Sequence, residues 1–258
     1  GLDERLNTAH AAWLAAELNA GAITLLKNEE EMIPVTALDK RKIAILSIGN
    51  PLSDKFSETV NRYVKADAYY ITKATPASKV QQIYAKLNKY DLILCAVHTV
   101  RIPESLALRQ LAMKKDVIYS FFTIPYFCKS YKKSIEASRS TVLAYEATPL
   151  AQEYAAQVIF GGIGAKGKLP VTIPDMYFSG TGILTEKSRL GYHEPEAVGI
   201  NATRLKEVTR IAEEGIRANA YPGCQILVAK DGMIVYNRSF GCDDYVHRRP
   251  VTDMSVYD

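Results

Sequence analysis

Residues 160–174 read FGGIGAKGKLPVTIP, and this stretch decides the fold. The helix-like run Pro149–Phe160 ends at a Gly-Gly pair, because glycine closes a helix more easily than any other residue. Two prolines then flank an apolar-polar-apolar triplet, which predicts an extended segment that is neither helix nor central strand. The glycines do not form a P-loop, since the Gly-Lys-Ser/Thr ending is absent and the stretch follows a helix. We interpret it as a helix C-cap and a turn.

Five short apolar runs precede this stretch, and each has the length of a β-strand. Continuous apolar runs of this length are typical of strands that are buried on both faces of a sheet. Helix-like stretches separate them, the clearest being residues 78–88 with apolar positions at i, i+3, i+4 and i+7. This alternation predicts an α/β protein, a three-layer α/β/α sandwich with a mostly parallel sheet. The runs are Ile43–Ile48, Ala68–Ile71, Leu92–Val97, Val117–Phe122 and Thr141–Tyr145.

The sequence changes character after Pro174. Residues 176–200 are glycine-rich and lack periodicity, which indicates a linker or a tail wrapping the first domain. Asn201 is expected to cap a helix, and Asp231-Gly232 between two β-rich runs predicts a hairpin. One helix and one hairpin bury little core, so we interpret them as part of an incomplete second domain. The predicted domains are 1–175 (α/β), 176–200 (linker or tail) and 201–258 (truncated second domain).

Composition excludes several function classes. The net charge of +4 arises from 32 basic and 28 acidic residues that are dispersed, unlike the clustered basic stripe of a nucleic-acid-binding protein. No apolar run approaches the ~20 residues of a membrane span. The four cysteines never occur at C-x-x-C spacing, so the sequence predicts neither a zinc site nor a redox motif. We therefore expect no metal, no cofactor, no nucleic acid and no membrane span.

Four pieces of the chain, in order over about residues 8–190, resemble the C-terminal α/β domain of family 3 glycoside hydrolases. The resemblance implies retaining glycosidase chemistry, which needs a carboxylate nucleophile and an acid/base about 5 Å apart. In that family the nucleophilic Asp belongs to a separate barrel domain, so we expect the barrel to precede Gly1 as a partner in cis and no catalytic residue here. The pieces are Leu25–Glu29 with Ile33-Pro34, Phe122–Tyr126, Ala144–Gln152 and the Gly-Lys-Leu-Pro-Val-Thr segment at 167–172.

The loop after the third apolar run favours one branch of that family. In the β-glucosidase branch a long loop from this domain supplies the acid/base Glu, whereas residues 98–104 are short. The resemblance therefore points to the β-N-acetylglucosaminidase branch, in which a barrel histidine transfers the proton. His98 and Arg101 follow a strand's carboxyl end, where α/β domains place ligand contacts, and ordinary loop polarity is the alternative. Glu104 is the local acid, with a first-turn helix acid after Pro103 as its alternative.

A second resemblance covers about residues 195–258. The helix, Tyr-Pro-Gly, strand, Asp-Gly, strand and Arg249–Thr252 look like the opening of serine β-lactamases and penicillin-binding proteins. In that family the nucleophile lies in an S-x-x-K motif shortly after a stretch like Met254–Asp258, so this chain stops before it. The S-x-x-K at Ser130–Lys133 lies in the first domain without partner motifs, and we interpret it as a chance match.

We therefore expect a fragment of a larger bacterial hydrolase that is inactive by itself. The resemblance implies a parent that hydrolyses terminal β-linked N-acetylglucosamine or related glycosides, with carbohydrate bound through the barrel and a β-lactamase-like fusion. A cell-wall substrate favours a periplasmic or secreted parent. The alternatives are a non-enzymatic flavodoxin-like binding or scaffold module and a serine hydrolase that uses Ser130. An unpaired strand edge in the C-terminal hairpin further favours a dimer.

Overall fold

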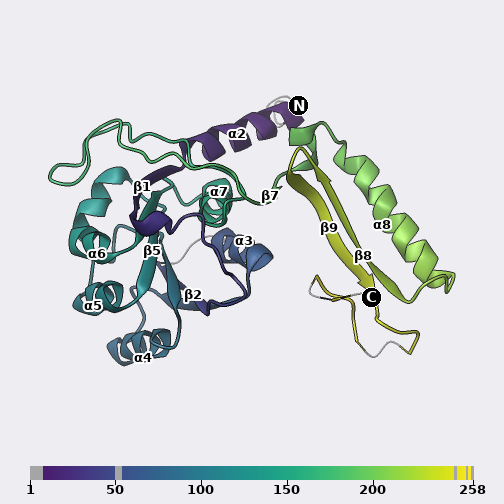
Figure 1. The fold of residues 1–258 in the computed structure, drawn as a ribbon, viewed down its shortest axis with the longest axis horizontal. Helices are drawn as coiled ribbons and strands as arrows, with labels where there is room; N and C mark the ends of the chain where they lie inside the picture. Colours follow the sequence, from purple (N-terminus) through teal and green to yellow (C-terminus); the bar gives the residue numbers. More distant parts are fainter. Residues whose placement is uncertain (1–7, 50–53, 247–248, 254, 257–258) are drawn as a thin grey trace. The chain divides into compact units, whose positions relative to one another are not determined.

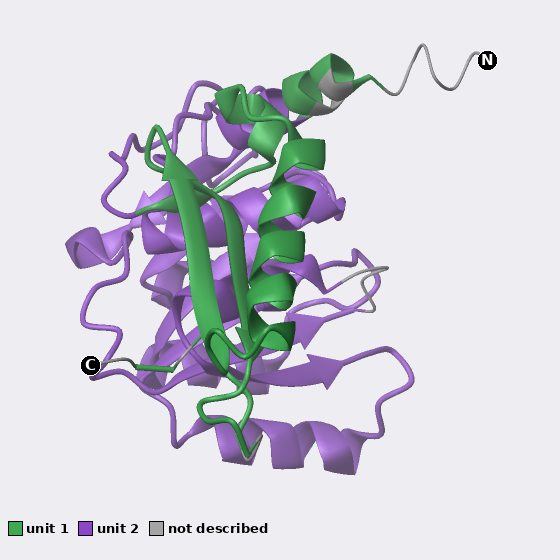
Figure 2. Cartoon of the chain, turned by 90° about the vertical axis from the view of Figure 1, so that its right-hand side faces the viewer, with its two compact units in different colours: residues 1–15, 190–258 green, residues 16–189 purple. Residues whose placement is uncertain are grey.

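The structure is a computed structural model that describes residues 8–49, 54–246, 249–253 and 255–256. It divides into two compact units, Ala16–Arg189 and Leu190–Asp258 with Gly1–Ala15 (Figure 2). We call them unit 2 and unit 1, as in the figure. Residues 1–7 and 50–53 of the predicted first domain and residues 247–248, 254 and 257–258 of the predicted second lie outside the described residues. The predicted domain limits stay a prediction.

Unit 2 is built around a six-stranded sheet in the order β1-β6-β5-β4-β2-β3 (Figure 1). All neighbouring pairs are parallel except β1 with β6, which is antiparallel at the sheet edge. The mostly parallel sheet confirms the predicted α/β class. Its strands are β1 (Thr24–Asn28), β2 (Ile43–Ile48), β3 (Ala66–Ile71), β4 (Leu92–Val97), β5 (Asp116–Phe121) and β6 (Ser140–Leu143).

Helices cover both faces of this sheet and make three layers. Residues that alternate along each central strand, such as Leu46 and Cys95, share a core with α4, α5 and α6, because successive side chains in a strand point to opposite faces. The helices α3 and α7 pack against each other over the opposite face (Figure 1). The helices that cover the sheet are α3 (Lys55–Tyr63), α4 (Ala77–Leu87), α5 (Leu106–Lys114), α6 (Lys132–Ala137) and α7 (Pro149–Phe160), with 3-10 turns η1 (Glu29–Glu31) and η2 (Pro125–Tyr131). The helix α2 (Ala9–Ala22) precedes β1, and its residues up to Ala15 are counted with unit 1.

The stretch that follows α7 has the predicted conformation. Gly161 closes the helix in the left-handed region at φ 74°, which confirms the C-cap. The chain then runs without regular structure, and the Gly167 N–H donates to the Ile23 carbonyl at 3.1 Å. A Cβ on Gly167 would overlap the Ala22 carbonyl oxygen, so only glycine fits this close approach.

The residues after this stretch return along unit 2. The Ile183 N–H donates to the Leu25 carbonyl at 2.8 Å, and the N–H groups of Ser188 and Arg189 both donate to the Gly161 carbonyl at 2.9 Å. The Arg189 guanidinium also donates to the carbonyls of Val35 and Phe160. Because backbone groups must be paired when they leave water, these bonds fix the segment against the sheet domain.

Unit 1 contains a helix and a small three-stranded sheet in the order β7-β9-β8. The Asn201 side chain accepts from the Thr203 N–H at the start of α8, which confirms the predicted cap. Asp231 and Gly232, with φ of 53° and 75°, form the predicted turn, because two positive φ values match the twist of a hairpin. The elements are β7 (Gly191–Tyr192), η3 (Pro195–Val198), α8 (Ala202–Arg217), β8 (Gly223–Lys230) and β9 (Met233–Gly241).

Among the residues that the structure describes, no helix is both long enough and apolar enough to cross a membrane.

Candidate functional site

The carboxyl ends of β2 and β4 form the point at which the strand order reverses. The chain passes from β2 to β3 on one side and then returns to β4 on the other, and open α/β sheets bind ligands outside such a point. Gly49 follows β2 at φ 108°, and a Cβ there would lie 3.0 Å from the Thr99 methyl group. The His98 N–H donates to the Ile48 carbonyl at 2.8 Å, so the residues after β4 begin in a fixed position.

His98 lies on the side of the sheet covered by α3 and α7. Its ring stacks on Phe122 at 4.6 Å with 6° between the planes, and Phe122 meets Phe56 of α3 edge to face. Both ring nitrogens are buried without a hydrogen-bond partner among the described residues. Burial lowers the pKa of His98 to about 4, although the nearby Asp54 carboxylate acts in the opposite direction. His98 is therefore a neutral, packed ring.

Both carboxylate oxygens of Glu104 accept hydrogen bonds within the fold. One of its oxygens accepts from the Arg109 guanidinium at 2.9 Å, and the other accepts from the Ser134 N–H in the first turn of α6. Its side chain is only 9% exposed. The expectation that Pro103 and Glu104 open α5 was wrong: the helix begins at Leu106, because the Ser105 hydroxyl accepts from the Leu108 N–H and acts as the cap. Glu104 lies before α5 and joins it, through Arg109, to the first turn of α6.

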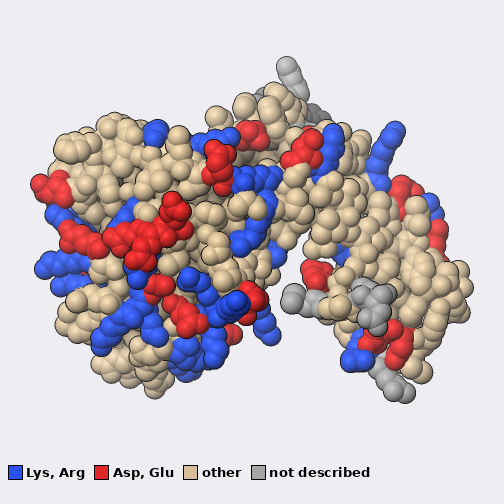
Figure 3. Space-filling view, in the orientation of Figure 1, with Lys and Arg blue, Asp and Glu red and all other residues tan. Residues whose placement is uncertain are grey.

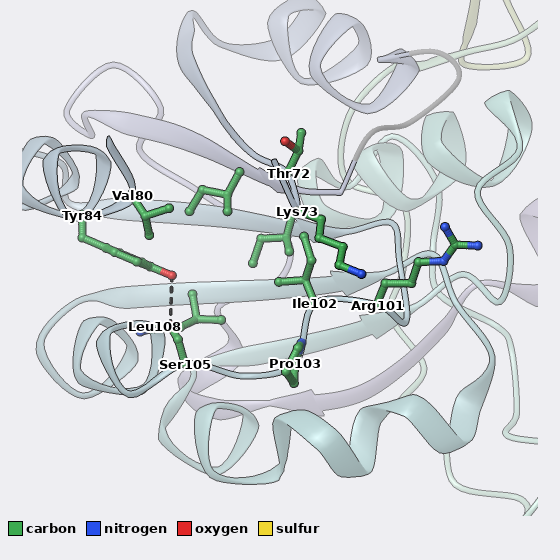
Figure 4. A pocket seen from close by; sticks show the side chains of 11 residues that line it. Thr72, Lys73, Val80, Tyr84, Arg101, Ile102, Pro103, Ser105 and Leu108 are labelled. Carbon is green, nitrogen blue, oxygen red and sulfur yellow. Dashed lines mark hydrogen bonds between the residues drawn. The ribbon is translucent and has the colours of Figure 1, made fainter. Parts of the chain in front are cut away.

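Arg101 lines a pocket of about 300 Å³ at the carboxyl ends of β2 and β3 (Figure 4). The pocket lies against α4 and α5, on the face of the sheet opposite to His98. Lys73, Thr72, Tyr84 and Ser105 are its other polar residues. The Lys73 and Arg101 side chains lie on one side and Tyr84 on the other (Figure 4). The apolar lining consists of Ile48, Ile71, Val80, Ile102, Pro103 and Leu108.

Tyr84 brings a neutral hydroxyl to this pocket. Its oxygen lies 3.2 Å from the Ser105 hydroxyl, and burial raises the pKa of Tyr84 to about 12. The phenol therefore stays protonated at neutral pH and can donate a hydrogen bond. The apolar periodicity of residues 78–88 placed Tyr84 on the buried face of its helix, but the sequence did not reveal that its hydroxyl reaches a pocket.

The three residues selected from the sequence thus go to three places rather than to one constellation. His98 packs under α3, Glu104 joins α5 to α6, and Arg101 alone reaches the pocket. Sequence reasoning missed Lys73, since an exposed lysine in a loop carries no signal of its own. Its position directly beyond the carboxyl end of a predicted parallel strand was the available clue. Whether His98 and Arg101 face a barrel stays a prediction.

The remaining motifs have structural explanations. Ser130 lies in η2 and is exposed, and none of the described hydrogen bonds joins it to Lys133. All four cysteines are free, with Cys95 and Cys128 buried. The described residues contain no cluster of three His, Cys, Asp or Glu side chains that could hold a metal ion. On the face of the molecule in Figure 3, basic and acidic side chains are interspersed.

Comparison with known proteins gives a match in structure alone. No protein-family model and no curated protein matches the sequence. A family 3 β-N-acetylglucosaminidase from Paenibacillus sp. str. FPU-7 is 16% identical with a TM-score of 0.56, over 65% of this chain and 34% of that chain. A fungal multi-domain family 3 β-N-acetylglucosaminidase is 16% identical with a TM-score of 0.56, over 93% of this chain and 30% of that chain. A β-glucosidase from Listeria innocua is 18% identical with a TM-score of 0.51, over 67% of this chain and 28% of that chain.

These structures share the fold with this chain, which spans about a third of their length. They support the resemblance to family 3 glycoside hydrolases at the level of the α/β architecture. The β-lactamase-like module predicted for residues 201–258 stays a prediction.

Proposed function

We propose that residues 16–189 are the companion α/β domain of a family 3 glycoside hydrolase. The observation that carries the proposal is the mostly parallel six-stranded sheet, whose structural neighbours include two β-N-acetylglucosaminidases and a β-glucosidase. The catalytic nucleophile belongs to a barrel joined in cis, and carbohydrate binds through that barrel. The parent hydrolyses terminal β-linked N-acetylglucosamine or a related glycoside.

The carboxylates near the strand reversal support a role without an acid/base from this domain. Both oxygens of Glu104 are bonded, to Arg109 and to the Ser134 N–H. Asp54 is engaged as well, since one oxygen accepts from the Ser57 N–H and the other from the Tyr70 hydroxyl. A general acid must be free to meet a leaving group within hydrogen-bond reach, and neither side chain is. Residues 201–258 are the start of a β-lactamase-like module in this proposal.

The test is the release of 4-nitrophenol from its β-N-acetylglucosaminide. The 258-residue chain should give no release above a buffer control, whereas a longer chain that carries a barrel should be active. Activity of the 258-residue chain would overturn the proposal, since a nucleophile would then lie within it. If a 4-nitrophenyl ester were hydrolysed instead and Ser130→Ala abolished that activity, the serine hydrolase alternative would replace it.

A further inference from the structure

The pocket beside Arg101 has the properties of a preformed ligand site. Its volume of about 300 Å³ lies at the lower end of small-molecule sites, and it is placed where open parallel sheets bind ligands. Most of its lining is apolar, with a few polar groups, as in other ligand pockets. All the elements that form it belong to unit 2.

Both loops that wall the pocket are held by hydrogen bonds. On one side, the buried Tyr131 hydroxyl donates to the Ile102 carbonyl at 2.8 Å, and the Arg101 N–H donates to the Thr99 hydroxyl at 3.2 Å. On the other side, the Thr72 N–H donates to the Thr75 hydroxyl at 2.8 Å, and the Thr75 N–H returns to the Thr72 carbonyl at 3.0 Å. A ligand therefore meets walls that are already ordered, which reduces the entropic cost of binding.

Charge decides the kind of ligand. Lys73 and Arg101 stand on the same side of the pocket, and no carboxylate lines it (Figure 4). Neither residue takes part in an ion pair among the described residues, so no described carboxylate neutralises Lys73 or Arg101, whereas the Arg109 guanidinium, for example, is bound to Glu104. Two cations beside an apolar cavity attract an anion that also carries an apolar group, and Arg binds carboxylate and phosphate oxygens through its planar fork.

We propose that this pocket binds a small organic anion, a carboxylate or a phosphate ester, with its apolar body against Val80, Ile102 and Leu108 and its anionic group on Lys73 and Arg101. The Tyr84 hydroxyl lies opposite the cations and suits a polar substituent at the other end of the ligand. The volume fits a body of about one six-membered ring, given that a benzene molecule occupies a cavity of about 150 Å³. The proposal stands independently of the glycosidase assignment.

The experiment is an NMR titration of the ¹⁵N-labelled 258-residue chain with three probes. Phenylacetate and phenyl phosphate carry the anion, and phenylacetamide is the neutral match of phenylacetate. We expect the two anions to shift the amide signals of Thr72, Lys73, Arg101 and Ser105 saturably, with phenylacetamide binding at least threefold more weakly. The stronger of the two anions identifies the natural class as carboxylate or phosphate ester.

Variants separate the site from general surface charge. Lys73→Gln and Arg101→Gln should each weaken binding of the preferred anion about threefold, the effect of one partly exposed ion pair. Lys79→Gln removes an exposed lysine of α4 that does not line the pocket and should change nothing. Val80→Phe should abolish binding with both cations intact, because the larger ring fills the cavity.

Three results would overturn the proposal. They are the absence of shifts at the pocket amides with tens of millimolar anion, equal binding of phenylacetamide, and equal weakening by Lys79→Gln. An unchanged dispersion of the remaining amide signals shows in each variant that the fold is intact.

Discussion

Unit 2 and unit 1 both contain β-structure, but they bury it to very different extents. Every residue of β2 and β4 is buried, since helices cover both faces of the six-stranded sheet. In the hairpin β8–β9 only Ile234 and Tyr236 are buried, and α8 contributes only Ala212 to the core among its described residues. Because stability follows the apolar area removed from water, the two units differ in what a single substitution can cost.

The largest expected effect lies in the centre of the large sheet. Leu94 of β4 is fully buried, so Leu94→Ala should lower the free energy of unfolding of unit 2 by about 3 to 4 kcal/mol through lost contacts and a cavity. Leu227 of β8 is 52% exposed, and Leu227→Ala should cost below about 0.5 kcal/mol. Urea unfolding followed by circular dichroism measures both. A cost at Leu227 that equals the cost at Leu94 would remove the contrast between the units.

Amide hydrogen exchange tests the same contrast without a substitution. Amides of β2 and β4 should exchange only through global opening of unit 2, whereas those of β8 should exchange through cheaper local opening. Equal protection in the two sheets would contradict this expectation.

The sequence predicted those parts of the fold that depend on local patterns. The runs of β2 and β4 coincide with the observed strands, because a strand buried on both faces must be apolar at every position. The cap at Asn201 and the turn at Asp231-Gly232 depend on a few adjacent residues, and both were confirmed. Local chemistry fixes such features wherever the segment lies.

Features that depend on distant partners could not be predicted. The short strand β1 exists because it pairs antiparallel with β6, which lies far along the chain. The helix α3 has a mostly polar sequence, and only Phe56 and Val60 among its larger apolar residues reach the core. In the pocket, Lys73 and Arg101 come from loops after different strands, so their proximity follows from the parallel sheet and not from their spacing.

The next prediction concerns His98, at the carboxyl edge of the large sheet, and the pH dependence of stability. The pKa of His98 falls from 6.5 to about 4 in the folded protein, so at pH between these values the unfolded chain binds a proton that the folded chain does not. The free energy of unfolding is therefore highest above pH 6.5, where both states hold a neutral ring. It falls by up to about 3 kcal/mol as the pH falls towards 4. Urea unfolding between pH 7 and 4 measures it.

Matched variants isolate this residue from the carboxylates that titrate nearby. His98→Phe keeps a ring against Phe122 and should flatten the pH dependence of stability between pH 6.5 and 4. Leu227→Ala, which removes no titratable group, should leave the slope unchanged. An NMR titration of His98 with a midpoint near 6.5 would refute the explanation, because the ring would then not be desolvated.

The third prediction tests the packed loop of unit 2 against an exposed ion pair. Glu104→Gln should destabilise unit 2 by about 1 to 2 kcal/mol, because it removes a charged partner of Arg109 that is largely shielded from water. Glu136→Gln removes an ion pair with Lys132 at 3.9 Å, in which the Glu136 side chain is 60% exposed. It should lower the free energy of unfolding by less than about 0.5 kcal/mol. Thermal unfolding compares the two, and equal losses would mean that Glu104 does not anchor α6.

The smallest effect is expected at the free edge of the hairpin. Among the described strands β8 pairs only with β9, so its other edge offers unpaired N–H and C=O groups over eight residues, and we propose weak dimers through this edge. Sedimentation velocity over a range of concentrations should show a monomer that shifts reversibly towards a dimer. Leu227→Lys places a charge beside the partner strand and should suppress the shift, whereas Ile211→Lys on α8, equally exposed, should not. A monomer at every concentration would show that the half-buried hairpin of unit 1 is protected from pairing despite its open edge, and a shift lost in both variants would assign the dimer to α8 instead.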